Sequence, residues 1–282
     1  ILIPFIGGLL CWQFERFGNT LPRWIALLTM GLLFGLGLWL WATGDFSLAP
    51  APGGDPVWPG RNQAQRINVM DHGHWLCGKG VQFPGNIEYA DDVMFMYLQG
   101  STQYDALGHV WCDDKLYNGY DANTTIGGMT KASVYPLAER GIVGRAVLID
   151  MARHRGKPVL DPGETFTHLD LLEAAAKQGV TIQKHDILII RTGWIGSFYE
   201  RDRVEFYKNF VEPGLTYSPE LVTWFHEMEI PNLVTDTIAN EVTMDPVSGV
   251  ALPLHIALMS NLGVTFTEIC QLDPLAADCA AD

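Results

Sequence analysis

Positive charge is scarce in this sequence. Its 282 residues include 18 Lys and Arg against 32 Asp and Glu, so the formal net charge is -14 at pH 7. Proteins that bind nucleic acid neutralise phosphates with clustered Lys and Arg, and the sequence contains no such cluster. The composition therefore argues against a nucleic-acid partner. The length allows one large domain with a smaller appendage.

Cysteine is also sparse and shows no pattern. The cysteines are odd in number, scattered and without a Cys-x-x-Cys pair: Cys11, Cys77, Cys112, Cys270 and Cys279. Disulfide frameworks and zinc–thiolate sites both use paired, regularly spaced cysteines. We therefore expect free thiols in a reducing compartment.

Long apolar stretches are absent except near the N-terminus. Residues 24–41 run from tryptophan to tryptophan without a charge. As a helix this stretch would span about 27 Å, close to the ~30 Å of a bilayer core, and terminal tryptophans suit the membrane interface. A shorter apolar run covers residues 1–12. We expect residues 1–48 to form a transmembrane segment or hairpin that contacts the lipid bilayer through residues 24–41. A buried core helix and a signal peptide are the alternatives.

These runs resemble the beginning of subunit M of the NADH-quinone oxidoreductase. The similar stretches are LIPFIGGLLCW at residues 2–12, ERFG at 15–18 and LPRWIALLTMGL at 21–32, and the resemblance ends near residue 57. It gives no residue a functional role, and its abrupt end suggests a fusion. We expect a membrane location if residues 1–48 are native to the protein and a cytoplasmic one otherwise. Residues 49–59 form a Pro-, Gly- and Ala-rich linker.

Residues 60–282 have the alternating pattern of an α/β domain. Two runs rich in β-branched residues, 145–151 and 186–190, suit strands buried on both faces. Thr167 and Gly179 mark the start and the end of a helix between them. Three helices and one further strand are predicted, at residues 168–178, 219–228, 253–262 and 264–270. The pattern predicts an α/β fold with a mixed β-sheet core and outer helices.

A turn at residues 99–109 concentrates side chains that bind metals or move protons. It follows an apolar stretch, residues 93–98, where a strand is expected to end. Its sequence, QGSTQYDALGH, resembles the His-x-Gly-Thr-His-x-Asp-x-Pro-x-His signature of the cyclase family. These hydrolases include bacterial kynurenine formamidase and isatin hydrolase. Thr102, Asp105 and His109 match the signature, whereas Gln99 and Gln103 replace two of its histidines.

The resemblance extends over residues 58–282. Its other points are ADD at 90–92, YNGY at 117–120, RTG at 191–193, LPLH at 252–255 and Glu268. It implies the cyclase-family fold and a homo-oligomer. It also implies a first and a last strand that this sequence lacks, so we expect a domain truncated at both ends.

The resemblance implies a metal site and roles for its residues. Asp105 would be the principal carboxylate ligand and His109 the general acid/base, with His255 and Glu268 completing the site. Gln99 and Gln103 would occupy ligand positions, where an amide oxygen binds zinc more weakly than imidazole does. Three states are open. The site holds one metal, Zn or Mn, on Asp105, His255 and Glu268. It prefers a harder ion such as Mn or Mg with oxygen ligands. Or it works without metal, and the glutamines donate hydrogen bonds to an oxyanion.

Family members hydrolyse an amide or lactam of an aromatic amine. The resemblance therefore implies a bacterial hydrolase of the arylformamidase or lactam type, acting in tryptophan catabolism on a C–N bond other than a peptide bond. The candidate substrate-binding residues are Thr102, Tyr104, His74, Trp75 and Trp111. Glu268 shares its strand parity with Val264 and Phe266, so it is expected to point inward, where a carboxylate needs a partner or a metal. The alternative is a catalytically inactive truncated fusion, or a structural or binding protein.

Overall fold

The computed structural model describes residues 2–14, 16, 18, 20–43, 58, 60–208 and 211–281. The chain divides into two compact units, residues 1–51 and residues 52–282, and each is described by itself. The linker predicted at residues 49–59 lies almost entirely outside the described residues.

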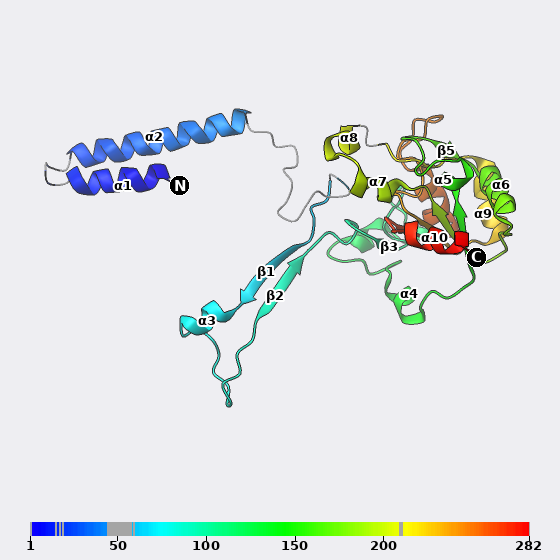
Figure 1. Cartoon of the computed structure of the whole chain (residues 1–282), viewed down its shortest axis with the longest axis horizontal. Helices are drawn as coiled ribbons and strands as arrows, with labels where there is room; N and C mark the ends of the chain where they lie inside the picture. The colour runs from blue at the N-terminus through cyan, green and yellow to red at the C-terminus, as the bar shows by residue number, and fades with distance from the viewer. Residues whose placement is uncertain are drawn as a thin grey trace. The chain divides into compact units, whose positions relative to one another are not determined.

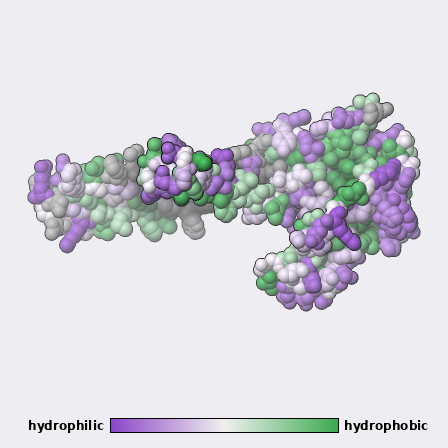
Figure 2. Space-filling view, turned by 90° about the horizontal axis from the view of Figure 1, so that it is seen from below, coloured by the Kyte–Doolittle hydropathy of each residue, from purple (hydrophilic) through white to green (hydrophobic). Residues whose placement is uncertain are grey.

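The first unit is a pair of helices, α1 (Leu2–Phe14) and α2 (Thr20–Thr43), that pack side by side (Figure 1). Gly7 allows this close approach, because a Cβ atom there would lie 2.5 Å from Thr29 Oγ1. One stretch of α2, Thr20–Trp39, is long and apolar enough to cross a membrane, and none of it is buried. Apolar residues are correspondingly exposed at the surface of this unit (Figure 2). A single helix of this kind near an N-terminus also has the properties of a signal sequence.

The second unit is built on a five-stranded mixed sheet, as the sequence predicts. The strand order is β3-β9-β8-β6-β4. The strands are β3 (Gln103–Asp105), β4 (Ala146–Asp150), β6 (Ile187–Arg191), β8 (Asn232–Thr235) and β9 (Thr265–Glu268). All neighbouring strands are parallel except β3, which pairs antiparallel with β9. The antiparallel pairing sets the turn at residues 99–109 beside the last strand of the sheet.

Helices cover the sheet and complete the core. They are α5 (Met151–His154), α6 (His168–Gln178), α7 (Trp194–Glu200), α8 (Arg203–Lys208), α9 (Pro219–Met228) and α10 (Asp273–Ala281). A further helix, α4 (Tyr135–Arg140), has no buried residue and lies on a loop away from the sheet (Figure 1). The remaining short elements are the 3-10 turns η2 (Tyr117–Gly119) and η3 (Ala122–Thr125) and the paired strands β5 (Thr165–Phe166) and β7 (Gly214–Leu215). The middle of the core is formed by one fully buried residue from each of the four parallel strands: Ile149, Leu188, Leu233 and Phe266.

Helix α6 has the boundaries that its sequence predicts. Its N-terminus carries a capping box in which Thr167 N donates to Asp170 Oδ2 at 2.8 Å. It ends at Gly179, whose φ of 74° is left-handed and favours glycine. Ser218 is the N-cap of α9, and its Oγ accepts a hydrogen bond from Leu221 N at 3.1 Å. Local chemistry alone fixes both helices.

The helix predicted at residues 253–262 differs from the expectation. It is a π-helix, η4 (His255–Leu262), closed by Gly263 with φ 79°. A π-turn is wider than an α-turn and is frequent at functional sites, and η4 begins at a residue of the candidate site. The strand predicted at 264–270 is the shorter β9, with Glu268 buried as its parity predicts.

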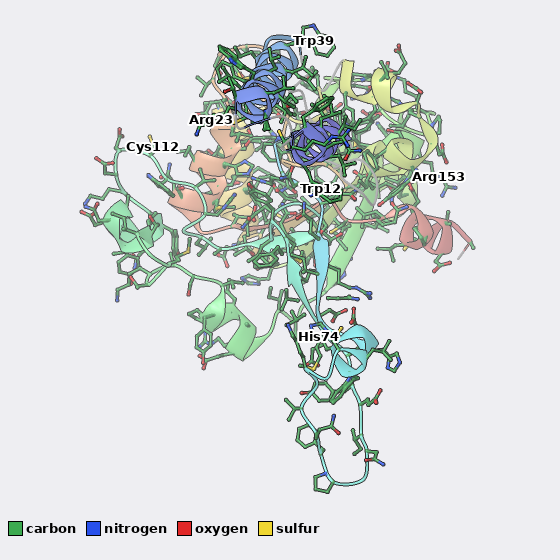
Figure 3. All side chains as sticks on the ribbon, turned by 90° about the vertical axis from the view of Figure 1, so that its left-hand side faces the viewer. Trp12, Arg23, Trp39, His74, Cys112 and Arg153 are labelled. Atoms are coloured by element: carbon green, nitrogen blue, oxygen red, sulfur yellow. The ribbon has the colours of Figure 1, made fainter. Side chains whose placement is uncertain are left out.

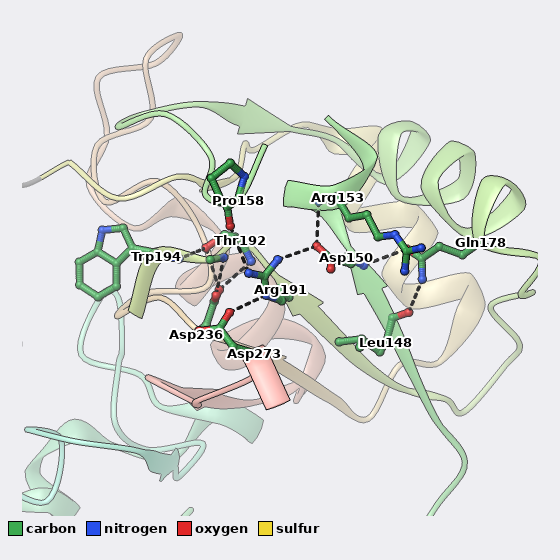
Figure 4. Close-up of polar contacts among 11 residues, drawn as sticks. Leu148, Asp150, Arg153, Pro158, Gln178, Arg191, Thr192, Trp194, Asp236 and Asp273 are labelled. Carbon is green, nitrogen blue, oxygen red and sulfur yellow. Dashed lines mark hydrogen bonds and ion pairs between the residues drawn. The ribbon is translucent and has the colours of Figure 1, made fainter. Parts of the chain in front are cut away.

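A buried carboxylate holds the segment after β6 (Figure 4). Asp236 accepts hydrogen bonds from Thr192 N at 2.8 Å, Thr192 Oγ1 at 2.7 Å and Gly193 N at 2.6 Å. Burial raises the pKa of Asp236 to about 6 against the effect of these donors. Arg191 beside it binds Asp273 at 2.7 Å and Asp150 at 3.0 Å. The Arg-Thr-Gly segment therefore anchors strand β6 rather than meeting the candidate site directly.

A two-stranded ribbon projects from the second unit. It consists of β1 (Gln65–Met70) and β2 (Asp91–Phe95), joined through the short helix α3 (His72–Leu76) (Figure 1). A strand was expected to end in the apolar stretch 93–98, just before the motif turn. Strand β2 does end there, at Phe95. The structure places this strand in the separate ribbon and not in the central sheet.

Candidate metal centre and active site

Three ligand-type side chains meet at the β3–β9 edge of the sheet. Asp105 ends β3, Glu268 ends β9 and His255 begins η4. One ligand atom from each lies within 4.8 Å of the others, and all three residues are buried. Antiparallel pairing sets Gln103 opposite Glu268, so the motif turn and the last strand meet as expected.

Glu268 is held in place by two amide groups. Gln103 Nε2 donates to Glu268 Oε2 at 2.7 Å, and Asn240 Nδ2 donates to Oε1 at 2.9 Å. Burial raises the pKa of Glu268 to about 7, although His255 opposes that rise. Burial also raises the pKa of Asp105, against the charges of His109, His255 and Arg61. When two carboxyl groups lie this close, one of them favours the protonated form unless a cation joins them.

Glu241 fixes the orientation of His255. His255 Nδ1 lies 2.7 Å from Glu241 Oε1, and the backbone N–H groups of Leu254 and His255 donate to the same carboxylate at 2.8 Å each. A carboxylate only accepts, so Nδ1 carries the proton and Nε2 faces Glu268 at 3.4 Å. Burial alone would lower the pKa of His255, but Glu241 and Glu268 outweigh it and raise the pKa to about 10. A carboxylate behind a histidine in this way is the usual support for a metal ligand.

The orphaned atoms of the cluster fit a divalent cation. Among the described residues, Asp105 Oδ1 and Oδ2, Gln103 Oε1 and Asn240 Oδ1 are buried without a hydrogen-bond partner. Leaving such acceptors unpaired is costly, and a cation bound to the Asp105 carboxylate would remove part of that cost. Asp105, Glu268, His255 Nε2 and Gln103 Oε1 could together hold one ion. This oxygen-rich set suits Mn or Zn.

His109 lies four residues after Asp105, and its backbone N–H closes the turn by donating to Ala106 O at 2.8 Å. Burial lowers the pKa of His109, with the charges of His255 and Arg61 acting in the same direction and Asp105 opposing them. The imidazole is therefore neutral at pH 7, the form that accepts a proton.

The structure disperses the predicted substrate-binding residues. Thr102 Oγ1 donates to Ile269 O at 2.6 Å, which ties the motif turn to the end of β9. Tyr104 alternates with Gln103 and Asp105 along β3, so it faces the other side of the sheet, where its hydroxyl bonds Thr265. Trp111 is exposed beyond the turn.

His74 and Trp75 lie on α3, in the projecting ribbon (Figure 3). His74 Nδ1 accepts from Asp71 N at 3.0 Å, and Trp75 Nε1 donates to Tyr89 O at 3.2 Å. These contacts lie within the ribbon, and helix α3 lies at the part of the ribbon far from strand β3 (Figure 1). Gln99 stands at the start of the motif turn, and its carbonyl oxygen accepts from Arg61 at 2.8 Å.

Three residues of the site were not predicted from the sequence. Asn240 and Glu241 follow β8, and polar residues just beyond the carboxyl end of a buried parallel strand are a usable signal for a site. Arg61 stacks its guanidinium 3.9 Å above the Trp58 ring. Its charge acts on Asp105 and His109, but nothing in its local sequence marks that position.

Comparison with known proteins agrees with this geometry. A family model described as "Putative cyclase" matches residues 30–242. A crystal structure of a novel cyclase is 36% identical, covers 80% of this chain and 75% of its own, and superposes with a TM-score of 0.69. The chain belongs to the cyclase family. The family match ends before His255 and Glu268, so their place in the cyclase site rests on the structure.

Isatin hydrolases share the cyclase fold. Isatin hydrolase A from Labrenzia aggregata, bound to benzyl benzoate, is 17% identical with a TM-score of 0.55 over 86% of this chain and 87% of that one. An isatin hydrolase bound to the product analogue thioisatinate is 18% identical, with a TM-score of 0.52 over 87% of each chain. At these identities the likeness concerns the fold alone.

A separate similarity covers a small part of the chain. NADH-quinone oxidoreductase subunit M from Pseudomonas aeruginosa is 71% identical over 58 residues, and the subunit from Escherichia coli K12 is 62% identical. These residues are 21% of this chain, and the chain spans only 11% of the length of these relatives.

Proposed function

We propose that this cyclase is a metal-dependent hydrolase that cleaves a C–N amide bond in a small aromatic substrate, an aryl formamide or a lactam. The observation that carries the proposal is the Asp105 carboxylate, buried beside His255 and Glu268 with both oxygens unpartnered. The isatin hydrolases of the same fold support the choice of an aromatic lactam or a related amide. This substrate class would give the enzyme a role in tryptophan catabolism.

Asp105, His255, Glu268 and Gln103 would hold the ion, with Gln99 at the edge of the site. The hydrogen bonds of Gln103 support a site that holds an ion rather than a metal-free site. Its Nε2 donates to Glu268 at 2.7 Å, whereas its Oε1 is buried without a hydrogen-bond partner. A free amide oxygen can bind a cation but cannot donate to an oxyanion. When bound, the divalent ion supplies polarisation of the substrate carbonyl and a more acidic water molecule.

His109 would move the proton. Its lowered pKa keeps the imidazole neutral at pH 7, so it can take a proton from water and deliver it to the leaving nitrogen. Aniline-type nitrogen leaves far more readily when protonated as the C–N bond breaks. Asp105, next to His109 in the turn, stabilises the transient imidazolium by its charge.

Metal removal tests the proposed function. Purified full-length protein in detergent is assayed against N-formylkynurenine, formanilide and isatin, before and after dialysis with a chelator. We expect activity on at least one substrate, loss after dialysis and recovery on adding Mn or Zn. Zinc should be removed more easily than from a site with two additional histidines, because amide oxygens are weak zinc ligands. Activity that survives complete metal removal would contradict the metal-dependent mechanism. Fully metal-loaded protein that hydrolyses none of these substrates would contradict the proposed hydrolase activity.

We also propose that α2 attaches the chain to a membrane. The support is its span-length apolar stretch, none of which is buried in the first unit. Fractionation of cells that express the intact chain is expected to place it in the membrane pellet, resistant to a carbonate wash. Recovery of uncleaved chain in the soluble fraction would contradict the anchor, and recovery of a shortened soluble chain would indicate a cleaved signal sequence.

A further inference from the structure

An arginine stands beside the candidate metal centre without a carboxylate partner of its own. Arg61 N donates to Trp58 O at 3.0 Å in a turn, and Arg61 Nη1 donates to Gln99 O at 2.8 Å, at the start of the motif turn. Other arginines bind carboxylates directly, such as Arg145, which contacts Asp186 at 2.6 Å. Within the described residues Arg61 forms no ion pair of this kind, although it is only partly exposed.

The ring of Trp58 fixes the position of the guanidinium. Arg61 Cζ lies 3.9 Å from the centroid of the Trp58 ring, which is a cation–π contact. Trp58 itself is half-buried and packs against the apolar cluster that contains Ile269, the residue after Glu268. The stacked pair is therefore supported from below by this cluster and tied through Gln99 to the motif turn. A side chain held in this way loses little freedom when it binds a ligand.

The charge of Arg61 reaches the metal centre. Burial lowers the pKa of Arg61, and the negative charges of Glu268 and Asp105 act against that change. The charge of Arg61 in turn contributes to the lowered pKa of His109, after burial and His255. Charges more than about 10 Å apart are largely screened. The guanidinium therefore lies close to the atoms that would hold the ion and move the proton.

A fixed cation is unfavourable beside a site for a divalent ion, because like charges repel. An anionic group that lies between the two cations removes this cost. A carboxylate is the natural choice, since a guanidinium presents its N–H groups as a planar fork that matches two carboxylate oxygens. The bond from Nη1 to Gln99 O uses one of these groups. Because no described acidic side chain pairs with Arg61, the anion has to come with the ligand.

On the basis of the proposed hydrolase function, we propose that Arg61 binds a carboxylate of the substrate and makes the site selective for aryl amides that carry an acid group. The chain has a net charge of -14, which repels anions over most of its surface, so an acidic substrate needs a local cation at the site. The Trp58–Arg61 turn then performs the role expected of residues that the structure disperses: Thr102, Tyr104, His74, Trp75 and Trp111.

Matched acids and amides test this selectivity by binding, independently of hydrolysis. The ligands are 2-, 3- and 4-aminobenzoate, each compared with the aminobenzamide that has a neutral amide in place of the carboxylate. Dissociation constants are measured by calorimetry on the full-length protein in detergent with excess Mn. We expect the parent to bind at least one acid more tightly than its amide. Arg61→Gln should lower that preference about ten- to a hundredfold, the effect of one charge-assisted contact.

Two further variants complete the comparison. Arg61→Met keeps an apolar stem over the Trp58 ring without the charge, so it should lose the preference as Arg61→Gln does. Arg66→Gln removes an exposed arginine that is paired with Asp92 in the ribbon, and it should keep the parental preference. Circular dichroism checks the folding of each variant, and mass spectrometry checks that Mn is retained at least as well as in the parent, because a neighbouring cation has been removed.

A parent protein that prefers none of the acids would overturn the proposal. A preference that persists in folded Arg61→Gln or Arg61→Met would also overturn it, because the bound ion itself would then hold the carboxylate. Failure of the proposed function has a different signature. The protein would then hydrolyse none of the corresponding formamidobenzoates, while the preference for an acid and its loss without Arg61 would still be measured.

Discussion

Asp105→Asn is expected to abolish binding of the divalent ion and to lower kcat/KM by at least about a thousandfold, which corresponds to ~4 kcal/mol of transition-state stabilisation. Asp105 carries both of the unpartnered carboxylate oxygens in the cluster. Asparagine keeps the shape of the side chain but removes the charge and turns one oxygen into a donor. The carboxylate of Glu268 and the imidazole of His255 then remain as the only charged or nitrogen ligands of the set.

The same substitution should not destabilise the metal-free protein. Burial raises the pKa of Asp105, so its charge is unfavourable in the folded state without a cation. The melting temperature of the metal-free variant should therefore equal or exceed that of the metal-free parent, whereas added Mn or Zn should stabilise the parent alone. Asp161→Asn, on an exposed side chain paired with Lys157, is the charge-matched control. A variant that melts lower without metal, and still binds metal, would show that Asp105 is structural.

Local rules predict the scaffold better than they predict the site. Both ends of α6 are set by interactions within one helical turn. The capping box of Thr167 and Asp170 sets its start, and the left-handed Gly179 sets its end. The β-branched runs became β4 and β6, as predicted, but alternate residues of each strand are only partly buried, and β4 lies at the edge of the sheet. The π-helical form of η4 was not predictable, because its sequence has ordinary helical spacing.

The residues of the candidate site were predicted from the family resemblance. The residues that support them became visible only in the structure. The motif turn and the late His and Glu were predicted to meet, and the structure brings Asp105, His255 and Glu268 together. Asn240 and Glu241 come from a loop after β8, and their partners lie 28 and 14 residues away in sequence. No spacing rule links such positions. The apolar stretch before the turn was correctly associated with a strand, but alternation alone does not say what covers its apolar face.

His109→Gln is expected to lower kcat/KM by about a hundred- to ten-thousandfold, the range that a general acid/base contributes, while the protein keeps its metal. His109 is not in the Asp105–His255–Glu268 cluster, and glutamine preserves hydrogen bonding at similar size but cannot carry a proton at neutral pH. Metal content by mass spectrometry and hydrolysis rate are measured on the same sample. This combination separates His109 from Asp105, whose substitution removes both.

The pH profile supplies the second readout for His109. Burial lowers the pKa of His109 below its ordinary 6.5, and a bound cation nearby would lower it further. The neutral form is the base, so kcat/KM should rise with pH along a limb centred below 6.5. His109→Gln should remove this limb, whereas His185→Gln, at an exposed histidine paired with Glu229, should leave both limb and rate unchanged. A His109→Gln enzyme with the parental rate and the same acidic limb would assign proton transfer to another group.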